Sequence, residues 1–368
     1  MPAEGNLIQQ TEAPPMDEKL SSQKSSFYGL LKEWGQLGHR LPNSGIGLYK
    51  KVFTNVLVYL RFEEVAFFGD KDQEPYTYML PILKSQVETL KDLLFFIDEK
   101  ELFSSDEADS YIYDMEQRHQ DLWQNLFNQY SERGYEKLIE SMSKRFEING
   151  LADKVVGKKC LDIGCGGGRQ CVSFSRMGAA SAAGVDFGDE NINFANKMKE
   201  KLGIKNIQYQ VGNAYDLPFE DNQFDIVSSN GVFHHLERMD RAFEEAFRVL
   251  KPGGWMWLYI NGAGGMFNDL MDTIKIIMQG TDRNGVLDIL RSFGLNEHKM
   301  YHLIDGFYAT YKYTRWHELI ELLEKIGFKN IKRLTGTNPT DFNLNKIKAD
   351  PYGDEKFGEG EIRLIAFK

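Results

Sequence analysis

Short apolar runs alternate with helical stretches from residue 158 to the end of the chain. Seven apolar runs predict buried strands, at residues 159–163, 182–185, 207–211, 224–228, 255–260, 328–334 and 361–367. Between them, the clearest helical patterns cover residues 190–202, 239–249 and 317–326. This alternation predicts an α/β fold with a mostly parallel sheet. We expect the last two strands to form an antiparallel pair at its edge.

The rest of the chain has a different character. Residues 1–26 predict a disordered tail, whereas residues 27–150 predict helices without a strand pattern. The clearest helix of this region follows Ser104 and Ser105. Within the α/β region, 151–368, a glycine-rich and aromatic stretch at 261–316 interrupts the alternation and predicts an insertion.

Composition excludes several partners. The chain has 44 Lys+Arg against 54 Asp+Glu, a net charge of −10, which argues against nucleic acid. No apolar stretch is long enough to span a membrane, and the N-terminus lacks the pattern of a signal peptide, so we expect a soluble, cytoplasmic protein. The spacing of Cys160, Cys165 and Cys171 matches no zinc motif, so we expect no metal site.

The glycine cluster 164–168 follows the first predicted strand directly and precedes a helix. Arg169 stands where the dinucleotide motif G-x-G-x-x-G needs glycine, and no Lys-Ser or Lys-Thr pair completes a phosphate loop. What remains is D-x-G-x-G-x-G, beginning at Asp162. A carboxylate here repels pyrophosphate and attracts a cationic cofactor such as S-adenosylmethionine. Asp186, which ends the next strand, is placed to accept hydrogen bonds from ribose hydroxyls.

These motifs resemble those of class I S-adenosylmethionine-dependent methyltransferases, in particular the group that includes the quinone C-methyltransferases. Other matching segments are residues 212–219, 224–227, 233–236 and 248–254, so the resemblance covers about 157–260. It implies a Rossmann-like fold and S-adenosylmethionine as cofactor. The cofactor contacts that it implies are Asp162, Gly164, Cys165 and Gly166 at the loop, Asp186 and Phe187 at ribose and adenine, Asn213 and Ala214 at the adenine edge, and Asn230 near the methionine moiety. The family usually has Asp at position 213, but an amide oxygen still accepts a hydrogen bond.

Candidate substrate residues lie on both sides of this module. His235 is the candidate catalytic base, and helix capping or packing beside the sheet is an equal alternative for it. For His234, packing is the favoured interpretation. In the resembling family, segments that flank the module cover the substrate, so we expect the N-terminal helices and residues 261–316 to form a substrate cap that includes Trp123, Tyr130 and Tyr311, with His234 beside them. Core packing is the alternative for the aromatic residues.

The sequence therefore predicts an enzyme that transfers a methyl group from S-adenosylmethionine to a small molecule. Oxygen, nitrogen and carbon acceptors all remain open. The alternative is a non-catalytic or non-methylating protein that binds the same cofactor and acts as a partner subunit.

Overall fold

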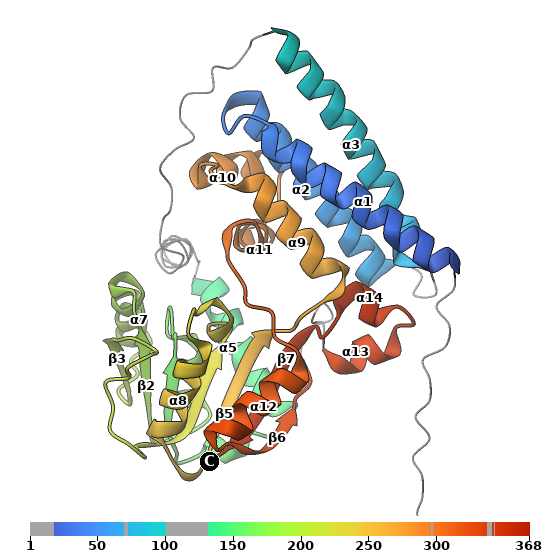
Figure 1. The fold of residues 1–368 in the computed structure, drawn as a ribbon. Coiled ribbons are helices and arrows are strands. Elements are labelled where there is room, and N and C mark those ends of the chain that lie inside the picture. Colours follow the sequence, from blue (N-terminus) through green and yellow to red (C-terminus); the bar gives the residue numbers. More distant parts are fainter. Residues whose placement is uncertain (1–17, 70–72, 101–131, 296, 337–340, 342) are drawn as a thin grey trace, which may run out of the picture.

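The computed structural model describes residues 18–69, 73–100, 132–295, 297–336, 341 and 343–368. Seven strands form one sheet in the order β3-β2-β1-β4-β5-β7-β6, as Figure 1 shows. The strands are β1 (Lys159–Ile163), β2 (Ser181–Asp186), β3 (Ile207–Val211), β4 (Phe224–Asn230), β5 (Leu250–Asn261), β6 (Lys329–Arg333) and β7 (Glu361–Phe367). Strands β1 to β5 pair in parallel, whereas β7 is antiparallel to both β5 and β6. The predicted α/β fold, with its antiparallel pair at one edge, is confirmed.

Within this pair, β7 lies beside β5 and β6 forms the edge of the sheet. One detail of the sheet differs from the prediction. Strand β5 begins at Leu250, five residues before the predicted 255, because Leu250 already pairs with Phe224 of β4. The exposed Pro252-Gly253 segment hides this early pairing from a pattern based on hydrophobicity.

Helices cover both faces of the sheet. Alternate residues of β1 face opposite sides, so Cys160 packs in one apolar cluster and Leu161 in another. The Cys160 side is covered by α5 (Glu132–Glu147), α6 (Arg169–Arg176) and α7 (Asp189–Lys201). The Leu161 side is covered by α8 (Met239–Val249) and α12 (Trp316–Ile326). The helices predicted at 239–249 and 317–326 are confirmed.

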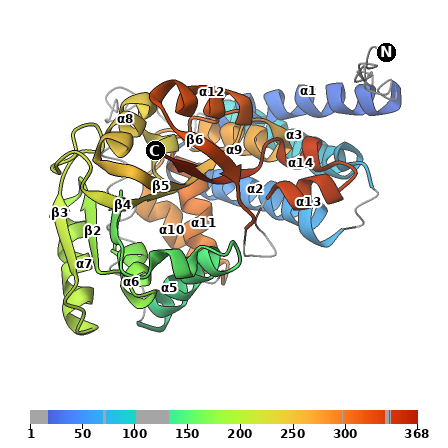
Figure 2. The ribbon, with the colours of Figure 1, turned by 90° about the horizontal axis from the view of Figure 1, so that it is seen from below.

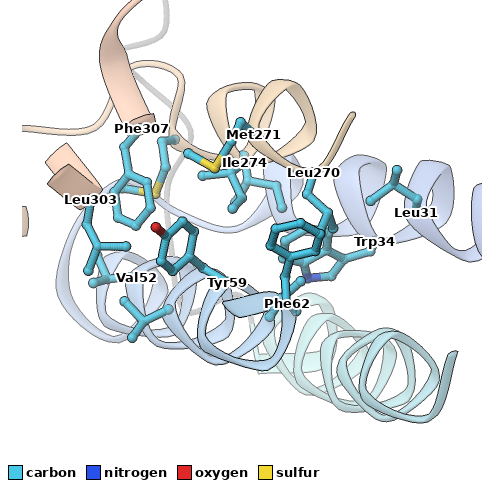
Figure 3. Packing of buried hydrophobic residues seen from close by; sticks show 14 of the residues in the cluster. Leu31, Trp34, Val52, Tyr59, Phe62, Leu270, Met271, Ile274, Leu303 and Phe307 are labelled. Carbon is cyan, nitrogen blue, oxygen red and sulfur yellow. The ribbon is translucent and has the colours of Figure 1, made fainter. Parts of the chain in front are cut away.

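A separate helical layer, visible beside the sheet in Figures 1 and 2, combines the N-terminal helices with the insertion. Its members are α1 (Glu18–Arg40), α2 (Gly45–Glu63), the π-helical turn Glu64–Phe68, α3 (Pro75–Lys100), α9 (Gly265–Met278), α10 (Arg283–Ser292), α11 (Glu297–Tyr308), α13 (Leu344–Ala349) and α14 (Gly353–Phe357). Figure 3 shows the core of this layer, where Trp34 of α1, Tyr59 of α2 and Ile274 of α9 are buried together. The N-terminal helices therefore hold the insertion in place by apolar burial.

The predicted tail 1–26 is wrong for residues 18–26, which belong to α1. Leu20 packs against the helical layer, and Phe27, Leu31 and Trp34 continue the same face of the helix. In the predicted helical region 27–150, most of the described residues are helical, but α5 packs on the sheet and not with α1 to α3. The helix predicted after Ser104 lies outside the described residues.

The predicted insertion leaves and rejoins the sheet at one place. Gly262, at the end of β5, forms a β-bridge with Thr314, and the amide of Ala263 donates to the carbonyl of Thr314 at 3.0 Å. Helices α9, α10 and α11 lie between these points. In the part of the chain that the structure describes, no helix has the length and apolar character needed to cross a membrane.

Candidate functional site

A cavity of about 360 Å³ opens at the carboxyl ends of β1, β2, β4 and β5. In parallel sheets this edge is the usual place for ligands. All nine residues predicted to contact the cofactor line the cavity, as do His234, His235 and Tyr311. The other two substrate candidates, Trp123 and Tyr130, lie outside the described residues. Of the described residues in 27–150, only Leu138, Met142 and Arg145 of α5 reach the cavity wall.

The glycine loop forms one wall and is held rigidly. Gly164 has a left-handed φ of 73°, and a Cβ added to it would lie 2.5 Å from a methyl group of Val232. The Tyr135 hydroxyl donates to the carbonyl of Gly167 at 2.7 Å, and the Tyr209 hydroxyl donates to that of Gly168 at 2.9 Å. Glycine is therefore required here for both conformation and space, and the loop keeps its backbone beside the cavity.

Asp162 is the penultimate residue of β1, and it is almost completely buried. The hydroxyl of Ser228 donates to its Oδ1 at 2.6 Å. Burial raises the pKa of Asp162 to about 7, although the Ser228 hydrogen bond and the nearby Arg169 act in the opposite direction. A cation that enters the cavity would favour the ionised form, so this carboxylate fits a positively charged ligand.

Asp186 joins the end of β2 to the glycine loop. Its Oδ2 accepts from the backbone amide of Gly166 at 2.8 Å. Its Oδ1 accepts from the backbone amide of Gly188 and from the side-chain Nδ2 of Asn191, each at 3.0 Å. Because a carboxylate oxygen accepts two hydrogen bonds, Oδ2 keeps one lone pair for a ligand hydroxyl. The carboxylate thus orients the loop and remains able to bind.

The outer part of the cavity is apolar and open. Phe187 is 44% exposed although it lines the cavity, so one ring surface is accessible to a ligand. Asn213 is also exposed, and its Oδ1 accepts from the amide of Tyr215 at 2.8 Å. Asn213 and Ala214 follow β3 directly through Gly212, so they reach the cavity from the carboxyl end of this strand.

Arg145 is a site residue that the sequence reasoning missed. Its Nη1 donates to Oδ1 of Asn230 at 2.7 Å, while its Nε is buried without a hydrogen-bond partner among the described residues. Burial lowers the pKa of Arg145, yet a guanidinium stays cationic in proteins. Leu138, Met142 and Arg145 share one face of α5, a pattern that would have identified them had α5 been assigned to the sheet.

The two histidines form a chain of hydrogen bonds whose tautomers are fixed by their partners. The amide of Asn261 donates to Nδ1 of His234 at 2.9 Å, so the proton of a neutral His234 is on Nε2. This nitrogen lies 3.0 Å from Nε2 of His235, whose Nδ1 donates to the carbonyl of Thr310 at 2.7 Å. Nε2 of His235 therefore accepts from His234, and burial lowers the pKa of His235 to about 4. In this arrangement the predicted base His235 has its lone pair engaged.

Asp305 of α11 also lines the cavity and was missed. Its Oδ2 accepts from the Tyr311 hydroxyl at 2.7 Å. Its position in an insertion without a motif gave no sequence signal.

The three cysteines are buried and unpaired by disulfides, and only Cys165 lines the cavity. Burial raises the pKa of each thiol. Among the residues that the structure describes, no group of His, Cys, Asp and Glu side chains has a metal-binding arrangement.

The comparisons with known proteins agree with this geometry. A family model described as "Methyltransferase domain" matches residues 161–258. Uncharacterized protein MJ1123 of Methanocaldococcus jannaschii is 29% identical over 244 residues, which are 66% of this chain and 98% of that protein. Uncharacterized methyltransferase YcgJ of Bacillus subtilis is 35% identical over 96 residues, 26% of this chain and 38% of its own.

The ubiquinone/menaquinone biosynthesis C-methyltransferase UbiE of Vibrio cholerae is 34% identical over 120 residues, 32% of this chain and 45% of its own. The match to YcgJ and to UbiE thus spans less than half of each relative. The matched segment nevertheless contains the glycine loop, Asp186, Asn213, Asn230 and the histidine pair. The resemblance derived from the motifs is confirmed: residues 161–258 match the methyltransferase domain model, and the chain is similar to methyltransferases.

Proposed function

We propose that this protein transfers the methyl group of S-adenosylmethionine to a small-molecule acceptor. The observation that carries the proposal is one cavity that combines two sets of residues. The cofactor set comes from the sheet edge, and the second set, Asp305 and Tyr311, comes from the insertion. A methyl donor and an acceptor would therefore meet in the same enclosed space, which is the main requirement of an in-line transfer.

The cofactor side fits the ligand's charges. Asp162 offers a buried carboxylate to the sulfonium and ammonium end. Burial raises its pKa to about 7, because the Ser228 hydrogen bond and Arg169 offset only part of that effect. Asp186 would accept from the ribose hydroxyls through the free lone pair of Oδ2. The exposed ring of Phe187 would stack on adenine, with Asn213 and Ala214 at its edge.

Arg145 is suited to the remaining charged group of the cofactor, the carboxylate of its methionine moiety. Its buried guanidinium lies against Asn230, the residue predicted near the methionine moiety, and keeps its Nε without a protein acceptor among the described residues. A carboxylate satisfies such a donor best. We assign the methionine carboxylate to Arg145 and Asn230.

The acceptor side suits a small molecule better than a macromolecule. The cavity wall there is built by Asn261 at the end of β5 and by Asp305 and Tyr311 of the insertion, whose helices α9, α10 and α11 belong to the helical layer. The relatives named above include a quinone C-methyltransferase, which supports a small organic acceptor. The hydrogen-bonded pair of His234 and His235 would position this wall, because the lone pairs of both rings already accept hydrogen bonds from protein groups.

Calorimetric titration tests the proposal first. S-Adenosylmethionine should bind and NAD should not, because the carboxylate at Asp162 opposes a pyrophosphate. Incubation with methyl-labelled donor and a panel of amines, alcohols, phenols, thiols and carbon acids should then yield S-adenosylhomocysteine with at least one class. Binding of S-adenosylmethionine without transfer to any class would instead support the partner-subunit alternative.

A further inference from the structure

We propose that Asp305 accepts the proton of a hydroxyl or amine acceptor during methyl transfer, and that Tyr311 is the positioning residue for its carboxylate. The inference rests on the proposed function and narrows its acceptor to a molecule with an O–H or N–H group at the reacting atom. It also assigns the role of the base to a residue of the insertion, in place of His235, which the sequence had indicated.

The two oxygens of Asp305 have different surroundings. Oδ2 accepts from the Tyr311 hydroxyl at 2.7 Å, whereas Oδ1 is buried and has no hydrogen-bond partner among the described residues. Asp305 and Tyr311 both line the cavity. A buried carboxylate oxygen without a partner is costly for folding, so such an atom at a cavity wall indicates a ligand donor.

The backbone holds this carboxylate in place. Asp305 lies on α11 between Leu303 and Phe307, which are buried in the core of the helical layer, as Figure 3 shows. Tyr311 follows α11 and packs against the histidine pair, edge-on to His234 with ring centroids 5.1 Å apart and tilted to His235 with centroids 4.8 Å apart. The helix and these ring contacts therefore fix the position of Oδ1 before a ligand arrives.

The charges around Asp305 come from three directions. Lys275 of α9 and Arg283 of α10 favour its ionised form, as does the hydrogen bond from Tyr311. Burial outweighs these effects and raises the pKa of Asp305 to about 6. The carboxylate is thus ionised at neutral pH but more basic than an exposed aspartate, which suits a proton acceptor.

The reaction balances with Asp305 as the acceptor of the proton. The lone pair of the acceptor oxygen or nitrogen forms a bond to the methyl carbon, the sulfur–carbon bond breaks, and its electron pair stays on sulfur. The O–H or N–H proton moves to Oδ1. A cationic sulfonium and an anionic carboxylate become a neutral thioether and a neutral carboxylic acid, so no charge separation remains in the cavity.

The chain provides a matched control for this residue. Asp269 of α9 accepts from the Tyr28 hydroxyl at the same distance, 2.7 Å, in the same helical layer. Burial raises the pKa of Asp269 as well. Asp269 does not line the cavity, and Tyr28 is 36% exposed, so this Asp–Tyr hydrogen bond matches that of Asp305 in length but lies outside the proposed site.

The experiment compares Asp305→Asn and Asp269→Asn in the full chain, with 2-phenylethylamine, 4-ethylphenol and 4-ethylbenzenethiol as probes from the acceptor panel, together with the best acceptor the panel yields. Asp305→Asn should lower transfer to the amine, the phenol or a panel acceptor of those classes by about 100-fold or more. Transfer to the aromatic thiol at pH 9 should fall by less than about fivefold, because an aromatic thiol is already ionised in solution at this pH and needs no base. Asp269→Asn should change every transfer rate by less than about twofold. Neither variant should change the Kd of S-adenosylmethionine by more than about twofold.

The pH profile separates a proton acceptor from a merely structural residue. Wild-type transfer to an O–H or N–H acceptor should rise with pH around a midpoint near 6, and Asp305→Asn should lose this rise. Tyr311→Phe should shift the midpoint upward, because the lost hydrogen bond favoured the carboxylate.

Undiminished transfer by Asp305→Asn, or transfer to carbon acids only, would overturn the proposal. If Asp305→Asn fails to fold, an unshifted midpoint in Tyr311→Phe overturns it equally. Absence of transfer to the whole panel, with S-adenosylmethionine still bound, would count against the proposed function instead.

Discussion

Ser228 of β4 donates its hydroxyl to the carboxylate of Asp162 on β1 across 2.6 Å, at the point where both strands reach the cavity. This pair joins neighbouring strands, and its hydrogen bond opposes the rise that burial causes in the pKa of Asp162. Two predictions depend on it.

The affinity for S-adenosylmethionine should depend on pH through Asp162. The pKa of about 7 in the free protein should fall when the cationic ligand binds, so binding should release a proton below pH 7. Affinity should rise by up to about tenfold per pH unit from pH 5.5 to 7 and then level off. Titration calorimetry in two buffers of different ionisation enthalpy measures both effects. Asp162→Asn should bind about tenfold more weakly at pH 8 and lose the pH dependence; a variant that keeps it would contradict the assignment.

The free energy of unfolding of the ligand-free protein should fall as the pH rises, whereas the affinity for the ligand should increase. The pKa of Asp162 is raised from 3.8 to about 7 in the folded protein, so ionisation of this group costs stability as pH rises from about 4 to 7 and the cost is constant above. Asp162→Asn removes the charge and should raise the free energy of unfolding of the ligand-free protein at pH 8 by roughly 1–4 kcal/mol. Urea denaturation at pH 5 and pH 8 checks this. The gain must be smaller at pH 5, and an equal gain at both values would refute it.

Gly164 should tolerate no side chain. Gly164→Ala combines a left-handed φ of 73° with a contact of 2.5 Å to Val232, whereas Gly157→Ala has a similar φ of 71° with no described atom within 4 Å. We expect a loss of about 1 kcal/mol for Gly157→Ala and about 2–4 kcal/mol for Gly164→Ala, measured by urea denaturation. Adding Val232→Ala should recover part of the second loss but not of the first. Equal losses for the two glycines would show that conformation alone matters.

Arg145 should recognise the carboxylate of the cofactor and nothing else on it. Arg145→Gln should weaken binding of S-adenosylmethionine by about 10- to 100-fold, because a charged hydrogen bond is lost. Decarboxylated S-adenosylmethionine should bind wild type and variant within about threefold of each other. Arg176→Gln is the control, since Arg176 pairs with Glu136 on the exposed surface. A similar weakening for both ligands would place Arg145 in a structural role only.

His235 should not supply the basic group. Its Nε2 accepts from His234 and its pKa is about 4, so it is neutral and engaged at physiological pH. His235→Gln should lower transfer by less than about tenfold and leave the rise near pH 6 in place. The pH–rate profile with the best acceptor decides the point, because loss of that rise in His235→Gln would return the basic role to the histidine.

The cavity wall proposed for the cofactor was predictable because local sequence encodes it. The loop glycines, Asp162 and Asp186 lie at strand ends, the edge where parallel sheets bind ligands, and all nine of the predicted contact residues line the cavity. The strands were predictable from local sequence too, because buried parallel strands are continuous apolar runs. The exposed start of β5 and the helical residues 18–26 fell outside these signals.

The acceptor half was less predictable because it depends on tertiary packing. Asp305 is one acidic residue in a helix without a motif, and only the fold brings it to the cavity beside Tyr311. Arg145 was obscured in the same way, since α5 was grouped with helices that pack elsewhere. The engagement of His235 follows from its hydrogen bonds with His234 and Thr310, which no sequence pattern reveals.

The bridge between Gly262 and Thr314 has an evolutionary meaning. Because the insertion departs from β5 and returns to the same point, its ends are already joined in space, and a different segment could be exchanged between them without moving a strand. Asp305 and Tyr311 lie inside this exchangeable segment, whereas the residues assigned to the cofactor lie outside it. Lineages could thus change what is methylated by recombination at one junction while the chemistry of the donor is inherited intact.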